Sequence, residues 1–107
     1  MLIDLKGDAW KLAETYNKLG TEEMLGQLCE ECGELVQAAQ KVRRAIKGTT
    51  PVSLDGAKVK IIEECADVLL CIDALTLGGI VDQTGVQFVG RYKNDRWYRR
   101  EVKGEDV

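Results

Sequence analysis

Two acidic hexapeptides nearly repeat each other, and their carboxylates are the side chains best placed for chemistry. They read E-E-C-G-E-L over residues 30–35 and E-E-C-A-D-V over residues 63–68. In a helix, residues three apart share one face and lie about 4.5 Å apart along the axis. One carboxylate pair in each hexapeptide has this spacing, which brings like charges together. Because such pairs repel and destabilise a helix, the pattern indicates that a bound cation reverses the sign of the interaction.

Both pairs also interrupt apolar helical faces. By helical spacing, Glu31 shares its face with Leu28 and Leu35, and Glu64 shares its face with Val68. Isolated ionised carboxylates are very costly to bury, and those that are buried are usually paired, neutralised or bound to metal. A solvated acidic face is the alternative. The pattern favours a metal site shared between two helices.

Composition confines the chain to one modest domain, which we place over residues 1–107. The net charge is -3, so no global positive field attracts nucleic acid, and none is expected as a partner. The first residues form no apolar signal region, and no run approaches the roughly 18 apolar residues of a membrane helix. We therefore expect a cytoplasmic protein without a secretory signal or a membrane span.

Histidine is absent from the sequence. This excludes Ser-His-Asp and Cys-His hydrolases and histidine-ligated zinc enzymes. Cys29 and Cys32 form a C-x-x-C spacing, but inside a helical pattern rather than beside a βαβ unit. Cys65 and Cys71 likewise lie in the apolar helical pattern that contains the second hexapeptide. We interpret all four cysteines as reduced, small core residues, with a four-cysteine zinc site as the alternative.

Apolar periodicity predicts four helices and no strand, which is an all-α fold. Gly20 is predicted to end the first helix, Thr21 to cap the second and Gly48 to stop it. After a loop over residues 48–53, the third helix is apolar almost all round and should be central. Asp82 can cap a weaker fourth helix. The predicted helices cover residues 8–19, 22–47, about 57–77 and about 83–98.

A single copy offers too few helices to cover the third one on every side. We therefore expect a homo-oligomer, either a dimer or a dimer of dimers. In a two-fold dimer the two long central helices of each copy would complete a helical bundle core with those of the partner subunit.

The two hexapeptides together resemble the E-E-x-x-E … E-x-x-D signature of the MazG-like all-α nucleoside triphosphate pyrophosphohydrolases. The likeness extends over most of the chain, and Y-K-N-D-R over residues 92–96 is similar to the family's Lys/Asn/Arg-containing final helix. Some members carry a lysine where this chain has Gly90. The resemblance implies a hydrolase that converts a (deoxy)nucleoside triphosphate to its monophosphate and pyrophosphate with Mg²⁺, in nucleotide-pool house-cleaning.

By position, the family's metal ligands carry over to Glu31, Glu34, Glu64 and Asp67. Mg²⁺ takes oxygen ligands and retains waters and substrate phosphates, so four carboxylates suit it, with Mn²⁺ as a possible substitute. Glu31, with Glu30 beside it, is the candidate catalytic residue that orients the attacking water.

A triphosphate also needs cations around the carboxylates. The chain offers Lys41 and Arg44, and the family places residues similar to Lys93, Asn94 and Arg96 at the site, often from a partner subunit. Trp10 is a candidate for stacking on the nucleobase, although core packing is the favoured interpretation of this aromatic ring.

Two further functions compete with the leading one. Phosphoribosyl-ATP pyrophosphatases share the same acidic scaffold. A helical oligomerisation or regulatory module with a purely structural metal belongs to a different class. Open positions on the metal distinguish an enzyme from such a module, because structural sites are closed by protein ligands.

Overall fold

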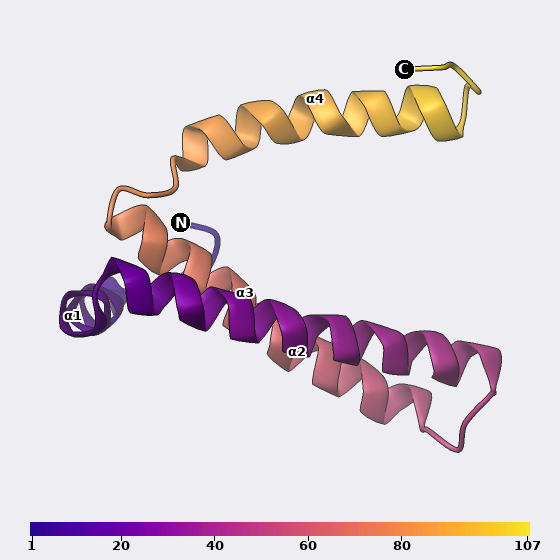
Figure 1. Cartoon of the computed structure of the whole chain (residues 1–107), viewed down its shortest axis with the longest axis horizontal. Coiled ribbons are helices and arrows are strands. Elements are labelled where there is room, and N and C mark those ends of the chain that lie inside the picture. The colour runs from indigo at the N-terminus through magenta and orange to yellow at the C-terminus, as the bar shows by residue number, and fades with distance from the viewer.

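The computed structural model describes all 107 residues, which form four helices and no strand. The all-α prediction is therefore confirmed. Figure 1 shows α2 and α3 running side by side in opposite directions, α1 lying near the start of α2, and α4 projecting away from the other helices. None of the helices combines the length and the apolar character that a membrane crossing requires. The helices are α1 (Ala9–Leu19), α2 (Thr21–Lys47), α3 (Leu54–Leu77) and α4 (Gln83–Glu101).

The ends of α2 differ in how well the sequence predicted them. Gly48 ends the helix as expected, in the left-handed conformation with φ 68° and ψ 24°, and its N–H donates to the carbonyl of Arg44. Thr21, predicted to cap the helix, is instead its first residue, and Gly20 holds the cap position. The Thr21 hydroxyl is hydrogen-bonded to the hydroxyl of Tyr16 on α1. This contact ties the two helices together across the turn.

The third and fourth helices are longer than predicted. Ser53 caps α3, because its Oγ accepts a hydrogen bond of 3.2 Å from the backbone N–H of Gly56. The helix therefore begins three residues before the predicted start. Asp82 caps α4 as expected, with its carboxylate accepting from the N–H of Thr84. The helix continues past the predicted end to Glu101.

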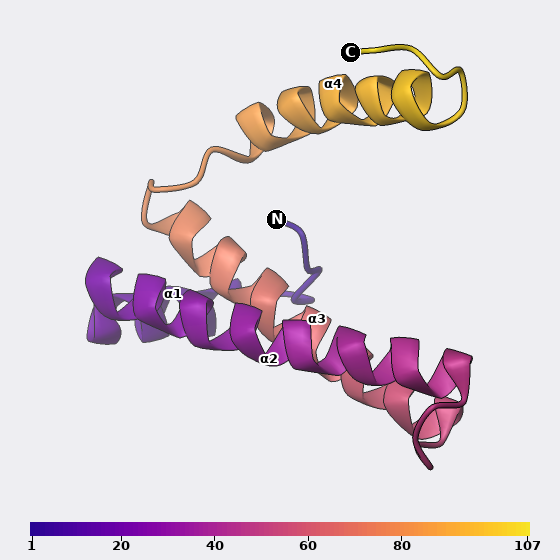
Figure 2. The ribbon, with the colours of Figure 1, turned by 45° about the vertical axis from the view of Figure 1, so that its right-hand side comes forward.

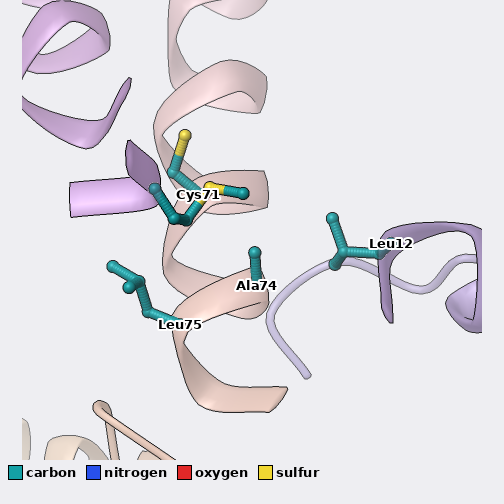
Figure 3. Close-up of a cluster of buried hydrophobic side chains, with 5 residues drawn as sticks. Leu12, Cys71, Ala74 and Leu75 are labelled. Carbon is teal, nitrogen blue, oxygen red and sulfur yellow. The ribbon is translucent and has the colours of Figure 1, made fainter. Parts of the chain in front are cut away.

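The core is small and centres on α3, as the sequence predicted. Ten of the 107 residues are buried, and seven of these lie on α3. The buried hydrophobic cluster joins the first three helices near one end of the α2–α3 pair (Figure 3). Its members are Leu12, Met24, Cys71, Ala74 and Leu75. Toward the other end of the pair, the buried residues are the small side chains Ala38 and Ala57.

The four cysteines are all free, but only Cys71 belongs to the core. Cys29, Cys32 and Cys65 are exposed. Predicting them as core residues was wrong, because they lie on the outward sides of α2 and α3, which no other helix of this chain covers.

A second buried group on α3 is charged. Asp73 is fully buried, and its carboxylate accepts hydrogen bonds from the backbone N–H groups of Leu2 (2.7 Å) and Ile3 (2.8 Å). It also accepts one of 2.7 Å from the side-chain amide of Gln83, the first residue of α4. Asp73 thus fastens both the N-terminal segment and the base of α4 to α3.

Beyond its base, α4 stands apart from the rest of the chain, as Figures 1 and 2 both show. It has no buried residue, and large apolar side chains such as Phe88, at 71% exposure, face outward. The radius of gyration is 17.0 Å, against about 13 Å for a compact chain of this length. The single chain is therefore open, with much apolar surface uncovered.

Candidate metal centre

The two acidic hexapeptides face each other because α2 and α3 are antiparallel neighbours. Glu31 and Glu34 project from α2, and Glu64 and Asp67 project from α3. Each of the four offers a carboxylate oxygen, and these oxygens all lie within 4.8 Å of one another. The structure thus brings together the four residues that the sequence singled out as ligands. We call them the carboxylate cluster.

Glu64 is the deepest member of the cluster, with only 2% of its surface exposed. One of its oxygens, Oε1, lies 3.0 Å from Nζ of Lys60, one turn earlier on the same helix. The other oxygen, Oε2, is buried and has no hydrogen-bond partner. Buried polar atoms without partners are rare in proteins, and an unmet need for an ion is one of the few explanations for them.

Glu31 repeats this arrangement on the opposite helix. Its Oε1 accepts a hydrogen bond of 2.7 Å from the side-chain amide of Gln27, which fixes the orientation of the carboxylate. Its Oε2 is buried without a partner. Both α2 and α3 therefore present one oriented carboxylate with one unpaired buried oxygen.

The electrostatics of the cluster indicate a deficit of positive charge. The pKa of Glu34 is raised above its ordinary value, first by the nearby Glu64 carboxylate, which accepts a hydrogen bond only from the protonated form of Glu34, then by the negative charges of Glu31 and Glu64. The pKa of Lys60 is raised by its hydrogen bond to Glu64 and by that carboxylate's charge. The cluster thus favours an added proton or cation.

This donor set fits a hard divalent cation. All four groups supply oxygen, which Mg²⁺, Mn²⁺ and Ca²⁺ prefer, and no nitrogen or sulfur ligand belongs to the cluster. The unpaired oxygens of Glu31 and Glu64 are the atoms that such an ion would satisfy. No three cysteines come close enough together to share an ion, so the alternative of a four-cysteine zinc site is wrong.

Two cavities adjoin the carboxylate cluster. The first, about 270 Å³, is mostly apolar, and we call it the apolar cavity. It is lined by Leu12, Thr15, Leu19, Met24, Gln27, Glu31, Asp67, Leu70 and Cys71. The second, about 210 Å³, is the lysine cavity, lined by Glu34, Gln37, Ala38, Lys41, Lys60 and Glu64. Each cavity includes one cluster residue from each helix. The cluster therefore lies between an apolar compartment and a charged one, in which Lys41 and Lys60 face Glu34 and Glu64.

The remaining predicted site residues have different surroundings. Lys41 lines the lysine cavity, whereas Arg44 is exposed and lines neither cavity. Glu30 is exposed and outside the cluster. The three candidates on α4 are exposed, namely Lys93, Asn94 and Arg96. Within one chain they are far from the cluster, because α4 lies apart from α2 and α3 (Figure 2).

Trp10 does not have the role that the sequence favoured for it. Its ring is 56% exposed on α1, with Nζ of Lys11 5.6 Å from the ring centroid, so it is not a core residue. It also lines neither cavity beside the carboxylate cluster.

Sequence reasoning missed Lys60 and Gln27, which contact the cluster directly. The signal was available in both cases. Each lies four residues before the carboxylate that it contacts, and this spacing places two side chains together on a helix.

Comparison of the chain with protein-family models, curated proteins and solved structures found no match. The function is therefore inferred from the residues and the geometry of this site.

Proposed function

We propose that the chain is a Mg²⁺-dependent nucleotide pyrophosphohydrolase of the MazG-like kind, acting in nucleotide-pool house-cleaning in the cytoplasm. Its substrate would be a (deoxy)nucleoside triphosphate, hydrolysed at the α–β linkage. The observation that carries the proposal is the carboxylate cluster, with oxygens within 4.8 Å and a buried, unpartnered oxygen on Glu64. The motif resemblance supplies the substrate class.

The four members of the carboxylate cluster would hold the cation. When bound, Mg²⁺ neutralises charge on the triphosphate and acts as a Lewis acid. Glu31 is the candidate for orienting the attacking water, because Gln27 fixes the orientation of its carboxylate, and a water on the cation that Glu31 helps to hold would lie beside it. Glu30, exposed beside it, would stand at the rim of the site. Water adds across the α–β anhydride bond and gives the monophosphate and pyrophosphate.

The two cavities offer the substrate two kinds of surroundings. The lysine cavity, with Lys41 and the amide of Gln37, suits phosphate groups. The apolar cavity has room for a nucleoside, and it presents Thr15 and Gln27 as hydrogen-bonding groups among apolar side chains. The triphosphate would then span the carboxylate cluster between the two compartments.

We also propose that the active form is a homodimer or a dimer of dimers. The support is the uncovered apolar surface of a single chain, including Val59 and Ile62 on α3 and Phe88 on α4. A second copy packed on α2 and α3 would complete a helical bundle, and α4 of one copy would reach towards the cluster of the other. This would bring Lys93, Asn94 and Arg96 of α4 to the carboxylate cluster of the other copy.

Sedimentation tests the proposed oligomer. At micromolar concentration it should detect no folded monomer, and a monomer that turns over substrate would overturn the proposal.

Pyrophosphate release from a panel of nucleotides, with Mg²⁺ and with a chelator, tests the activity. The panel includes phosphoribosyl-ATP, the substrate of the competing enzyme class. We expect Glu34→Gln and Asp67→Asn to lower turnover about a thousandfold, since a metal contributes several kcal/mol to such reactions. Glu23→Gln, an exposed change in the first turn of α2, is the matched control.

Two outcomes would overturn the proposed reaction. Undiminished turnover in both ligand variants would remove these residues from the site. Tight metal binding without pyrophosphate release from any nucleotide would favour the alternative of a helical module with a structural metal.

A further inference from the structure

Lys60 is the only basic side chain with an ion pair to the carboxylate cluster. Its Nζ lies 3.0 Å from Oε1 of Glu64 and 3.6 Å from Oε2 of Glu63, which is outside the cluster. The Lys60 side chain is 53% exposed, whereas that of Glu64 is almost entirely buried. The ammonium therefore reaches the buried carboxylate from the solvent side.

The same side chain borders the lysine cavity, together with Lys41 and Gln37. Lys60 therefore has two possible partners within reach of one flexible stem. One is the carboxylate of Glu64, and the other is any anionic group held in the cavity. A lysine side chain has four rotatable bonds, so a change of partner requires no movement of the helix.

Lys60 and a divalent cation would compete for the carboxylate of Glu64. The cation would be drawn to Oε2, the unpartnered oxygen of the carboxylate whose other oxygen is paired with Lys60. Two positive charges would then be separated by little more than one carboxylate group, and at such distances repulsion is strong where water is scarce. Binding of either cation must weaken binding of the other by the same factor.

We propose that Lys60 is a tethered counter-cation of the metal centre. It holds Glu64 while no divalent cation is bound, and it is displaced when one binds. Once displaced, it joins Lys41 in the lysine cavity and binds the phosphate groups of the substrate. This inference rests on the proposed function, because it assumes that the carboxylate cluster binds a divalent cation. Lys60 is then a positioning residue for Glu64 before metal binding and an anion-binding residue afterwards.

The test compares Lys60→Met with wild type in two binding measurements that require no turnover. By calorimetry, Mg²⁺ and Mn²⁺ should bind Lys60→Met about three- to tenfold more tightly, the size expected for a charge-assisted contact discounted for exposure. Inorganic pyrophosphate, titrated at saturating Mg²⁺, should bind this variant about tenfold more weakly. Opposite shifts for the two ligands are the signature of a partner exchange, because general damage to the site would weaken both.

Lys58→Met is the matched control, since Lys58 is exposed on the same helix, makes no ion pair and lines neither cavity. It should change both affinities by less than about twofold, as a remote surface charge does. Lys60→Arg retains the charge and should keep both affinities near those of wild type. An equal shift in Lys58→Met, or shifts of the same sign for both ligands in Lys60→Met, would overturn the inference.

A measurement on the unmodified protein covers the case in which Lys60→Met fails to fold. On addition of Mg²⁺, the side-chain NMR signals of Lys60 should move while those of Lys58 stay in place. Unmoved Lys60 signals at saturating Mg²⁺ would contradict the exchange and leave the proposed function standing. Wild-type protein that binds neither Mg²⁺ nor Mn²⁺ would overturn both proposals.

Discussion

Two buried carboxylates lie on α3, and they differ in how many partners the chain supplies to their oxygens. Asp73 is fully buried and accepts three hydrogen bonds, two from backbone N–H groups and one from Gln83. Glu64 is almost as deeply buried, yet it has a half-exposed lysine on one oxygen and no partner on the other. All partners of Asp73 are thus supplied by the fold.

The difference separates a carboxylate that organises structure from one that keeps an oxygen open to a ligand. Burying a charged group is strongly unfavourable unless hydrogen bonds or opposite charges compensate for lost water. At Asp73 the compensation is complete before any ligand arrives. At Glu64 it is incomplete, because one buried oxygen has no partner within the chain. Burial alone would have ranked the two residues as equivalent.

The largest expected effect tests the structural side of the comparison. Asp73→Ala leaves the N–H groups of Leu2 and Ile3 and the amide of Gln83 without their acceptor. We expect the free energy of unfolding to fall by about 2–4 kcal/mol, measured by urea denaturation without metal. Added Mg²⁺ should still raise the stability of this variant as it does in wild type. A variant as stable as wild type would mean that Asp73 does not fasten the N-terminal segment.

The next effect tests the ligand-binding side. Mg²⁺ at about a hundred times its dissociation constant should stabilise wild type by about 2.7 kcal/mol. Glu64→Gln should lose most of this gain, because it removes the charge of the most buried member of the carboxylate cluster. Without metal the same variant should be no less stable than wild type. Strong destabilisation of metal-free Glu64→Gln would make Glu64 a structural residue like Asp73, and the comparison would fail.

The smallest effect concerns pH. Because the pKa of Glu34 is raised, there is a pH range above its ordinary value in which the folded protein holds a proton that the unfolded chain has lost. This group therefore favours folding at low pH, and its contribution declines as pH rises from the ordinary glutamate value of 4.5 through the raised one. Metal-free Glu34→Gln should show a flatter dependence of stability on pH over that window. Glu23→Gln should show the same pH dependence as wild type. If all three proteins show the same dependence of stability on pH, the carboxylate of Glu34 does not interact with the other members of the carboxylate cluster.

The spacing of residues close in sequence predicted most of the helices, and it predicted that the four carboxylates come together. Helical spacing placed Glu31 with Glu34 and Glu64 with Asp67, and an antiparallel return was enough to bring the two pairs together. The loop around Gly48 fixed that return, since glycine readily adopts the left-handed conformation that ends α2. These features depend on residues close to one another in sequence.

Features that depend on distant residues were not predictable. Asp73 was visible as a polar residue in an apolar helix, but its backbone partners lie near the other end of the sequence. The exposure of Cys29 and Cys65 depends on which helix faces no neighbour, which periodicity does not reveal. The separation of α4 from the helix pair likewise follows from tertiary packing rather than from helix propensity.

In the proposed oligomer, the isolation of α4 within its own chain would link the folding of this helix to protein concentration. An unsupported helix of about this length is only marginally stable in water, because most helical stability in proteins comes from packing of an apolar face. The first residue of α4 is held by Asp73, but the rest of the helix has no buried residue in its own chain. Wherever a second copy covers that face, helix formation in α4 becomes part of a bimolecular reaction. Dilution would then favour unfolding of α4 as the copies separate, and only its first residue, Gln83, would keep a contact with α3 through Asp73.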